Sequence, residues 1–284
     1  MTDLQEWVGR TATVGDDLSA EHARGLVALL DRDPAALSAG IELPACWHWI
    51  YFRPATPQSA LGPDGHAQRG GFLPPIDLPR RMWVGGRIRF LSPLGIGRPA
   101  VRRSTILSIP SKAGRSGELV FVTVRHEIGG EGSNVVAIEE EQDLVFRGAP
   151  PRGEPAVPRS EPAPALADWS ERFRAYAVTL FRFSALTSNG HRIHYDHPYA
   201  TGVEGYPGLV VHGPLTALLL MDAAVRHREG SAGRPIGFQY RAVSPLFADE
   251  DMGLAGTSYR DGSAQVWATG PRGLAMSATV EWET

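Results

Sequence analysis

Alternating apolar and polar residues predict two groups of β-strands, one in each half of the chain. The clearest case is the C-terminal run, where Met276, Ala278, Val280 and Trp282 would share one face, because side chains two residues apart along a strand point the same way. Glycine-containing turns separate the other runs. The predicted strands are Arg87–Phe90, Val101–Ile109, Glu118–Glu127, Val135–Phe146, Val178–Phe183, Ile236–Val243, Met252–Tyr259, Ala264–Thr269 and Leu274–Trp282.

A spacing of three to four residues predicts two helices. Apolar residues recur in this way from Ala23 to Leu30, after the candidate N-cap Ser19. The segment Pro214–Val225 is apolar on nearly every side, which predicts a buried helix with Gly213 as its cap. The first half has no long apolar helix of this kind, so we expect it to leave space there for a ligand.

The chain divides almost in half at residues 148–166, where six of the 19 residues are proline. Such a composition is typical of an extended linker. We therefore predict an N-terminal unit at 1–147 and a C-terminal unit at 167–284.

The two units share short sequence matches. Ser92-Pro93-Leu94 in the first recurs as Ser244-Pro245-Leu246 in the second, and Gly71-Phe72-Leu73 and Gly208-Leu209-Val210 precede them in the same order. A duplicated unit with a buried helix followed by antiparallel strands predicts an α+β architecture in which a sheet wraps around a helix. This is the hot-dog fold.

Composition excludes several classes of protein. The 284 residues carry a net charge of −3, which does not favour a nucleic-acid partner. The single cysteine, Cys46, excludes a disulfide framework and a multi-cysteine zinc site. No leader-like or membrane-spanning apolar stretch is present in the sequence, so we expect a cytoplasmic protein that is not bound to a membrane.

Candidate chemistry is concentrated in one polar stretch and at the start of the apolar helix. A histidine there could move a proton, and the free N–H groups at a buried helix N-terminus could stabilise negative charge on a thioester oxygen. The candidate site residues are Asn189, His191, Arg192, His194, Tyr195, Asp196, His212 and Gly213.

These stretches resemble a known family. FSALTSNGHRIHYDHPYA (183–200), followed by PGLVVHGPL (207–215), is similar to the signature of the MaoC-like hot-dog acyl-CoA hydratases. The resemblance is strongest to the branch that contains 3-hydroxyacyl-thioester dehydratase type 2 and the mesaconyl-C4-CoA, 3-methylfumaryl-CoA and itaconyl-CoA hydratases. WHWIYFRPATPQSALGPDGH (47–66) and RGGFLPPIDLPRRMWVGGRIRF (69–90) extend it into the first half.

The resemblance implies a double hot-dog whose N-terminal half is degenerate and similar to the FAS1-like dehydratase domain. It implies a hydro-lyase that interconverts a 2-enoyl-CoA and a 3-hydroxyacyl-CoA, with a short branched dicarboxylyl group as the favoured acyl chain. Coenzyme A would enter as part of the substrate, with no further cofactor and no metal. A homodimer is a candidate assembly.

The resemblance also assigns roles. His194 would be the general acid/base, and the N–H of Gly213 part of the oxyanion hole. Asn189 stands where most family members have aspartate; because an amide cannot accept a proton, it would position the water. Arg192 would either bind a substrate carboxylate or pair with Asp196. His191, Tyr195, Asp196 and His212 are the other candidate substrate contacts.

Two readings from other classes remain open. A non-catalytic thioester-binding protein would explain an amide at the acidic position. A metal enzyme could use His191, His194 and His197 with Asp196, because neutral imidazoles with a carboxylate suit zinc or iron. Elsewhere, the acidic run Glu139–Asp143 is expected to form the solvated face of a strand, and the pairs Arg80-Arg81 and Arg102-Arg103 are candidates for binding coenzyme A phosphates.

Overall fold

The computed structural model describes residues 3–114, 117–148, 157, 160–228 and 233–284. Most of the predicted linker, 148–166, therefore lies outside the described residues. The helices are α1 (Ala20–Leu29), α2 (Ala177–Thr187), α3 (His197–Gly202) and α4 (Gly213–Arg226). The strands are β1 (Thr11–Asp16), β2 (Arg80–Phe90), β3 (Ala100–Ser108), β4 (Ser111–Gly114), β5 (Gly117–Gly130), β6 (Ile138–Arg147), β7 (Trp169–Arg174), β8 (Pro235–Ala242), β9 (Asp251–Gly256), β10 (Ser263–Gly270) and β11 (Gly273–Trp282).

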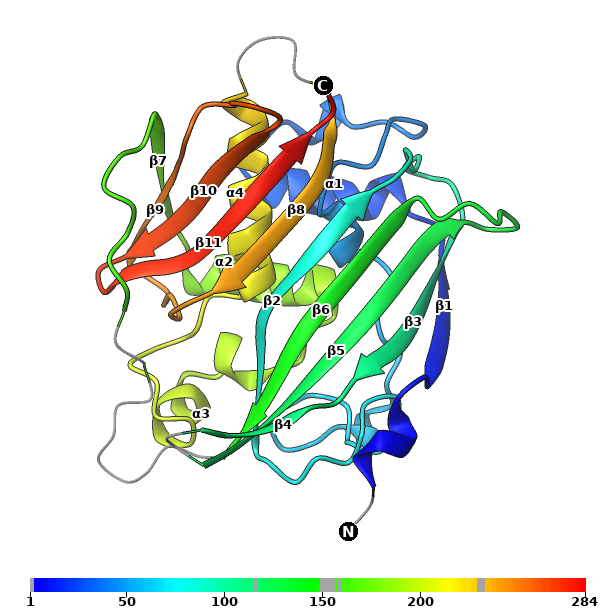
Figure 1. The fold of residues 1–284 in the computed structure, drawn as a ribbon, viewed down its shortest axis with the longest axis vertical. Coiled ribbons are helices and arrows are strands. Elements are labelled where there is room, and N and C mark those ends of the chain that lie inside the picture. Colours follow the sequence, from blue (N-terminus) through cyan, green and yellow to red (C-terminus); the bar gives the residue numbers. More distant parts are fainter. Residues whose placement is uncertain (1–2, 115–116, 149–156, 158–159, 229–232) are drawn as a thin grey trace.

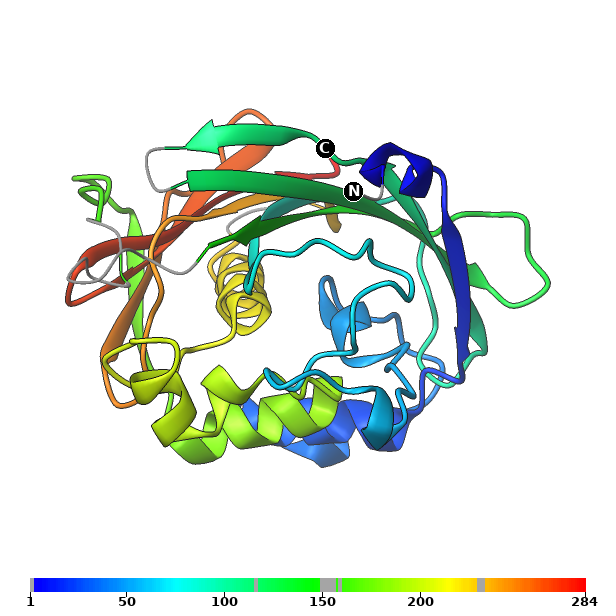
Figure 2. The same ribbon diagram turned by 90° about the horizontal axis from the view of Figure 1, so that it is seen from below.

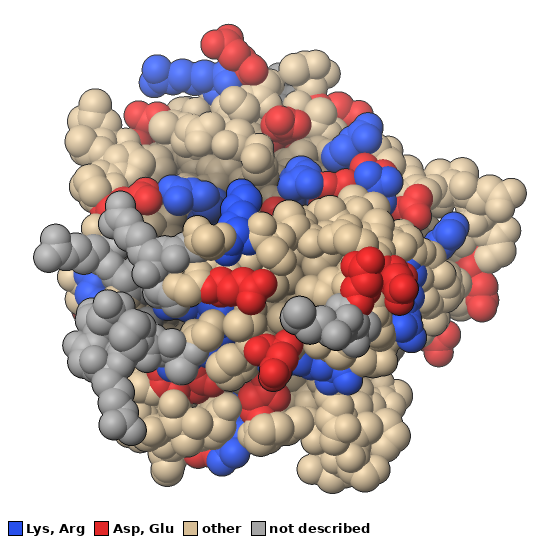
Figure 3. Space-filling view, turned by 60° about the horizontal axis from the view of Figure 1, so that its bottom comes forward, with Lys and Arg blue, Asp and Glu red and all other residues tan. Residues whose placement is uncertain are grey.

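One antiparallel sheet runs through both halves of the chain in the order β1-β3-β5-β6-β2-β8-β11-β10-β9-β7, with β4 paired to β5. β2 and β8 join the halves, from Gly85 opposite Arg241 to Arg89 opposite Gly237. The sheet arches over α4, and α1 and α2 close the opposite side (Figures 1 and 2). Basic and acidic side chains are interspersed on the face in Figure 3, which fits the small net charge.

The two halves repeat the same local hydrogen bonds. The Ala137 carbonyl accepts from the N–H groups of Leu91 and Ser92, at 2.8 and 3.1 Å. The Ala275 carbonyl accepts from Val243 and Ser244 at the same two distances. The predicted match between the two Ser-Pro-Leu runs is confirmed.

The second predicted match was wrong. The carbonyl of Leu209 accepts from Ala248, and its counterpart in the first half is the carbonyl of Ile41, which accepts from Ile96. The segment around Ile41, rather than Gly71-Phe72-Leu73, therefore corresponds to 208–210.

α4 is the predicted buried helix. Nine of its residues are buried, and its N-cap is His212, one residue earlier than expected. Beneath the first half of the sheet, the described chain has loops and a short 3₁₀-helix, Trp47–Ile50, in the corresponding space (Figure 2). Within the described part of the chain, no helix is long and apolar enough to cross a membrane.

The strand predicted at Val178–Phe183 was wrong, because this segment belongs to α2. Leu180, Phe183 and Ser184 form the buried face, at helical spacing, while Val178 is exposed. At the start of the helix, the N–H of the N-cap residue Tyr176 donates to the Oγ1 of Thr179 at 3.3 Å, which caps the helix. Packing against α1 and this cap outweigh the β-branched and aromatic composition that suggested a strand.

Candidate active site

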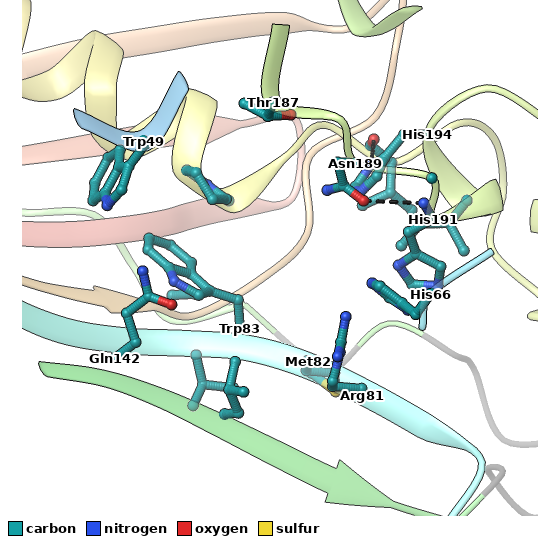
Figure 4. A pocket seen from close by; sticks show the side chains of 18 of the residues that line it. Trp49, His66, Arg81, Met82, Trp83, Gln142, Thr187, Asn189, His191 and His194 are labelled. Carbon is teal, nitrogen blue, oxygen red and sulfur yellow. Dashed lines mark hydrogen bonds between the residues drawn. The ribbon is translucent and has the colours of Figure 1, made fainter. Parts of the chain in front are cut away.

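A cavity of about 830 Å³ opens between the start of α4, the loop after α2, β2 and the loops of the first half. Both halves of the chain line it, and Figure 4 shows some of the lining side chains. Of the predicted site residues, Asn189, His191, His194 and Gly213 line this cavity.

His194 lies at the end of a single 3₁₀ turn, Arg192–His194, and is buried. Its Nδ1 is 2.7 Å from the carbonyl oxygen of Val210. Because a carbonyl can only accept, Nδ1 carries the hydrogen and Nε2 keeps its lone pair. Burial lowers the pKa of His194 to about 4, so the ring is neutral at pH 7 and can accept a proton.

His212 lies behind His194 rather than in the cavity. The two rings stack with their centroids 3.6 Å apart, and the Nε2 of His212 is 2.9 Å from the Oγ of Ser184. His212 is buried and is not among the residues that line the cavity. The predicted substrate contact of His212 is therefore corrected. Its ring stacks on that of His194 instead of lining the cavity.

The start of α4 supplies a hydrogen-bond donor to the cavity. Gly213 is the first residue of the helix, so its N–H has no partner within the helix. The next residue, Pro214, has no N–H. A Cβ on Gly213 would lie 2.6 Å from the ring of Trp83, so only glycine fits here without displacing that ring.

Asn189 is held in a tight turn after α2. Ser188 ends the helix in the left-handed region, with φ of 50°, and the Oδ1 of Asn189 accepts a hydrogen bond from the N–H of His191 at 3.0 Å. With Oδ1 used in the turn, the amide Nδ2 is the group that can donate to a water in the cavity (Figure 4).

A second turn of the same design lies against this one, and the sequence analysis did not assign it. Asp64 accepts from the N–H of His66 at 3.0 Å, as Asn189 does from His191. Gly65 has φ of +87°, and a Cβ there would lie 1.8 Å from the carbonyl oxygen of Gly190. The only sequence signal for this contact is the recurrence of an Asp/Asn-Gly-His triplet at 64–66 and 189–191.

The two turns bring their histidines together. The rings of His66 and His191 lie 4.2 Å apart, and His191 lies 5.5 Å from His194. The Nδ1 of His66 donates to Asp64 at 2.9 Å. Burial, and then the neighbouring His66 and His194, lower the pKa of His191 to about 2.

Three predicted substrate contacts belong to the scaffold of this loop. Arg192 donates from Nε and Nη2 to Asp196, at 2.9 and 2.7 Å, and from Nη1 to the carbonyl of Pro63 at 3.0 Å. Asp196 also caps α3, and the hydroxyl of Tyr195 donates to the carbonyl of Gly190. None of the three is among the cavity-lining residues. Of the two alternatives predicted for Arg192, the ion pair with Asp196 is the one that the structure shows. The predicted substrate contacts of Tyr195 and Asp196 are corrected.

The proposed metal set His191, His194, His197 and Asp196 is not brought together as a ligand group. His197 is an exposed first residue of α3, and Asp196 is engaged by Arg192. Among the described residues, the ligating atoms of Asp64, His66 and His191 do lie within 4.8 Å of one another. However, Asp64 is hydrogen-bonded to His66, and the nearby positive charge of Arg81, which acts on both histidines, opposes a bound cation.

The prediction that the acidic run Glu139–Asp143, now part of β6, forms a solvated face was only partly correct. Glu140 points inward and is buried, accepting from the Nε2 of His48 at 3.0 Å and the Nε1 of Trp49 at 2.8 Å. Burial raises the pKa of Glu140, but the hydrogen bond from His48, with the electrostatic effects of His48 and His126, outweighs burial and holds the pKa at about 2. Trp49, His126 and Gln142 line the far end of the cavity beside this carboxylate.

A neutral histidine, an amide and the open start of a buried helix line one cavity beneath a sheet that both halves share. This combination is typical of a hot-dog hydro-lyase that acts on acyl thioesters. Residues 46–248 match the family of hydroxyacyl-thioester dehydratase type 2. The chain is 48% identical to mesaconyl-C(4)-CoA hydratase of Chloroflexus aurantiacus over 98% of each chain. It is 26% identical to the mitochondrial hydroxyacyl-thioester dehydratase type 2 of Schizosaccharomyces pombe, over 72% of this chain and 75% of that one. The protein belongs to the hydroxyacyl-thioester dehydratase type 2 family.

Solved structures confirm the predicted α+β double hot-dog. A MaoC-like dehydratase has a TM-score of 0.69 at 16% identity, covering 99% of each chain. HtdX of Mycobacterium tuberculosis has a TM-score of 0.67 at 17% identity, covering 96% of this chain and 100% of that one. A further M. tuberculosis protein described as a double hot-dog has a TM-score of 0.59 at 11% identity, covering 97% and 96%.

Proposed function

We propose that this hydro-lyase adds water to a short 2-enoyl-CoA bearing a free carboxylate, of the mesaconyl-C4-CoA class, and dehydrates the corresponding 3-hydroxyacyl-CoA. The observation that carries the proposal is the buried neutral ring of His194, whose Nδ1 is tied to Val210 and whose Nε2 is free, in the same cavity as the N–H of Gly213. The 48% identity to mesaconyl-C(4)-CoA hydratase supports the substrate class.

In this mechanism each residue acts on one atom of the reaction. The thioester oxygen accepts from the N–H of Gly213, and Asn189 and His194 hold the water. The Nε2 of His194 takes a proton from the water as its oxygen bonds to Cβ, and the π electrons move into the thioester as an enolate. His194 then returns the proton to Cα, which restores the neutral ring. Electrostatic stabilisation of such an enolate is typically a large contribution to the rate.

The first half of the chain would hold the acyl group and the coenzyme, and residues 167–284 would supply the chemistry. Trp49 packs edge-on against Trp83 at 6.0 Å, and Trp83 stacks on Tyr240 at 4.6 Å. Trp49 and Trp83 line the cavity (Figure 4). Such an aromatic wall favours a short acyl chain over a long one.

Hydration of a conjugated thioester neither oxidises nor reduces the substrate, so the proposal requires no cofactor beyond the coenzyme A that the substrate carries. We propose coenzyme A rather than an acyl-carrier protein as the carrier of the acyl group, because the 48% identical relative is named for a CoA thioester. A homodimer and a cytoplasmic location stay predictions.

The test is an assay of purified protein on mesaconyl-C4-CoA (the same compound as 3-methylfumaryl-CoA), itaconyl-CoA and crotonyl-CoA, with the hydrated product identified by mass. We expect turnover of at least one dicarboxylyl-CoA, at a higher kcat/KM than that of crotonyl-CoA. Binding of these thioesters without hydration of any of them would instead identify a non-catalytic thioester-binding protein.

A further inference from the structure

The chemistry of the proposed substrate limits where its free carboxylate can lie. In a mesaconyl-C4 thioester, the carboxylate is attached to Cβ, the carbon that water attacks. A group that recognises this carboxylate must therefore reach the space next to His194 and Asn189. Arg192, the predicted candidate, does not line the cavity and is paired with Asp196.

Resting on the proposed function, we infer that Arg81 of β2 binds the free carboxylate of the substrate, at a site that it forms with His66 and His191. All three residues line the cavity. In Figure 4 the guanidinium of Arg81 points from β2 toward His66, on the side of the cavity where Asn189 and His194 lie. The first half of the chain would thus determine substrate specificity, and the second half would supply the catalytic residues.

The burial and charge of Arg81 are those expected of a group that binds an anionic ligand. Among the described residues, no carboxylate oxygen lies within the 4.0 Å of an ion pair with it. Asp64, the acid that acts on it electrostatically, is hydrogen-bonded to His66. Burial lowers the pKa of Arg81 to about 10, yet the group remains charged at pH 7. A desolvated charge without a close partner is costly, and a substrate carboxylate would offset that cost.

The positive potential of Arg81 reaches the imidazoles beside the catalytic position. After burial, Arg81 is among the charges that lower the pKa values of both His66 and His191. The contact of Gly65 with Gly190 fixes these two rings next to each other, and His191 lies 5.5 Å from His194. A carboxylate on Cβ would enter the space between Arg81 and these neutral rings when the thioester lies against Gly213.

Two other arginines at the cavity have different partners. Arg80 forms an ion pair with Glu204, at 3.0 Å between Nε and Oε2. Arg102 donates to the carbonyl of Phe52 at 3.2 Å and lies over its ring, with Glu140 as its main opposite charge. Arg102 is therefore placed beside the Glu140 network, and it serves as the alternative that the experiment must exclude.

The test compares two saturated thioesters that differ in a single group at Cβ. Succinyl-CoA carries a carboxylate there and butyryl-CoA a methyl group, and neither can be hydrated, so calorimetry measures binding alone. We expect the wild-type protein to bind succinyl-CoA more tightly. Arg81→Met should weaken succinyl-CoA binding by roughly 10- to 150-fold, the equivalent of losing a hydrogen bond to a charged group, and should leave butyryl-CoA binding within about threefold.

Two further variants make the result specific. Arg192→Met should weaken the loop and lower the affinity for both thioesters alike, whereas Arg81→Lys should retain part of the preference because it keeps the charge. Equal losses on both thioesters in Arg81→Met, or a preference that disappears in Arg102→Met instead, would overturn the assignment. If Arg81→Met does not fold, Arg81→Gln answers the same question. Failure of the wild-type protein to hydrate any enoyl-CoA would refute the proposed function. The preference for succinyl-CoA over butyryl-CoA would still be measurable, because calorimetry reports binding without hydration.

Discussion

At the scale of single residues, Asn189 is the departure from the pattern of the MaoC-like hydratases. Its Oδ1 accepts from the N–H of His191, so its Nδ2 can donate to a substrate water, but the amide cannot remove a proton from that water. In the proposed mechanism the acid–base work therefore falls to His194, whose tautomer is fixed by Val210.

A pair of substitutions tests this division of labour. Asn189→Asp keeps the acceptor of the turn, so we expect substantial activity with an added acidic limb in the pH profile, since the new carboxylate must be ionised to act. Asn189→Ala removes both the turn and the donor and should lose more activity. Steady-state kinetics from pH 5 to 9 would measure this, and the reverse order of the two variants would reject the role of Asn189.

The sequence predicted the half of the site that is contiguous along the chain. Asn189, His194 and Gly213 line the cavity as expected, because the short turns after α2 and the helix cap are local structures. Of the two partners predicted for Arg192, the structure shows Asp196, four residues away, because an ion pair at this spacing is also a local contact. Nothing local in the sequence brings His66 or Arg81 beside this loop. His66 is placed by the contact of Gly65 with Gly190, and Arg81 by its strand β2, both of which are distant from the loop along the chain.

At the scale of elements, the contact between the two Asp/Asn-Gly-His turns holds the site together. Gly65 is the least replaceable residue of this contact, since its φ is positive and its Cα faces the carbonyl of Gly190. The N–H of Arg192 also donates to the carbonyl of Asp64, at 2.9 Å. Movement of one turn would therefore displace the other.

We expect Gly65→Ala to lower kcat by at least about 10-fold, because an added Cβ must push the loop of His191 and His194 out of place. Gly132→Ala is the matched control: its φ is +73°, but nothing lies within 4 Å of the added Cβ. That variant should cost only the backbone strain, about 1–2 kcal/mol, with normal kcat. Kinetics and thermal melts of both variants measure this, and equal kcat values would contradict the proposed role of the contact.

The elements themselves were predicted unevenly. Most strands of the two half-sheets were predicted, because their buried and exposed positions alternate, and α4 was predicted because it is buried along its whole length. The sequence analysis missed the edge strands β1 and β7 and the four-residue strand β4. α2 was read as a strand because its buried face has only Leu180, Phe183 and Ser184, and its exposed face also carries apolar residues. Its helical state depends on packing against α1, a contact that is distant in sequence.

At the scale of the whole molecule, β2 and β8 make one sheet of the two halves. Residues 165–284 alone would expose the edge of β8 and lose the cavity wall formed by the first half. We therefore expect this fragment to aggregate or to be inactive when expressed alone. Size-exclusion chromatography and an activity assay would show this, and a soluble, fully active monomer would refute the arrangement.

Buried histidines make the stability of the molecule depend on pH. Burial lowers the pKa values of His126 and His194 to about 4 and that of His191 to about 2. Below about pH 6.5 the unfolded chain binds protons at these positions that the folded chain does not. The free energy of unfolding should therefore fall with falling pH, by up to about 4 kcal/mol per pH unit for three such groups.

Glu140, with a pKa of about 2, adds to this loss below about pH 4.5, because its ionised form is favoured by the folded state. Urea unfolding at pH 7, 6 and 5 measures the slope. His126→Asn should reduce it, whereas replacement of the exposed His197 by Gln should not. A stability that is constant between pH 7 and 5 would contradict the burial of these rings.

The most direct test of the central claim is the rate at which His194→Ala hydrates the best enoyl-CoA substrate of the wild-type protein. General acid–base catalysis by a positioned side chain is typically worth about 10²- to 10⁴-fold. We therefore predict at least about a 100-fold loss of kcat in a variant whose circular dichroism spectrum matches the wild type, with His197→Gln fully active as the control. Near-normal turnover by a folded His194→Ala would show that another group moves the proton and would contradict the account.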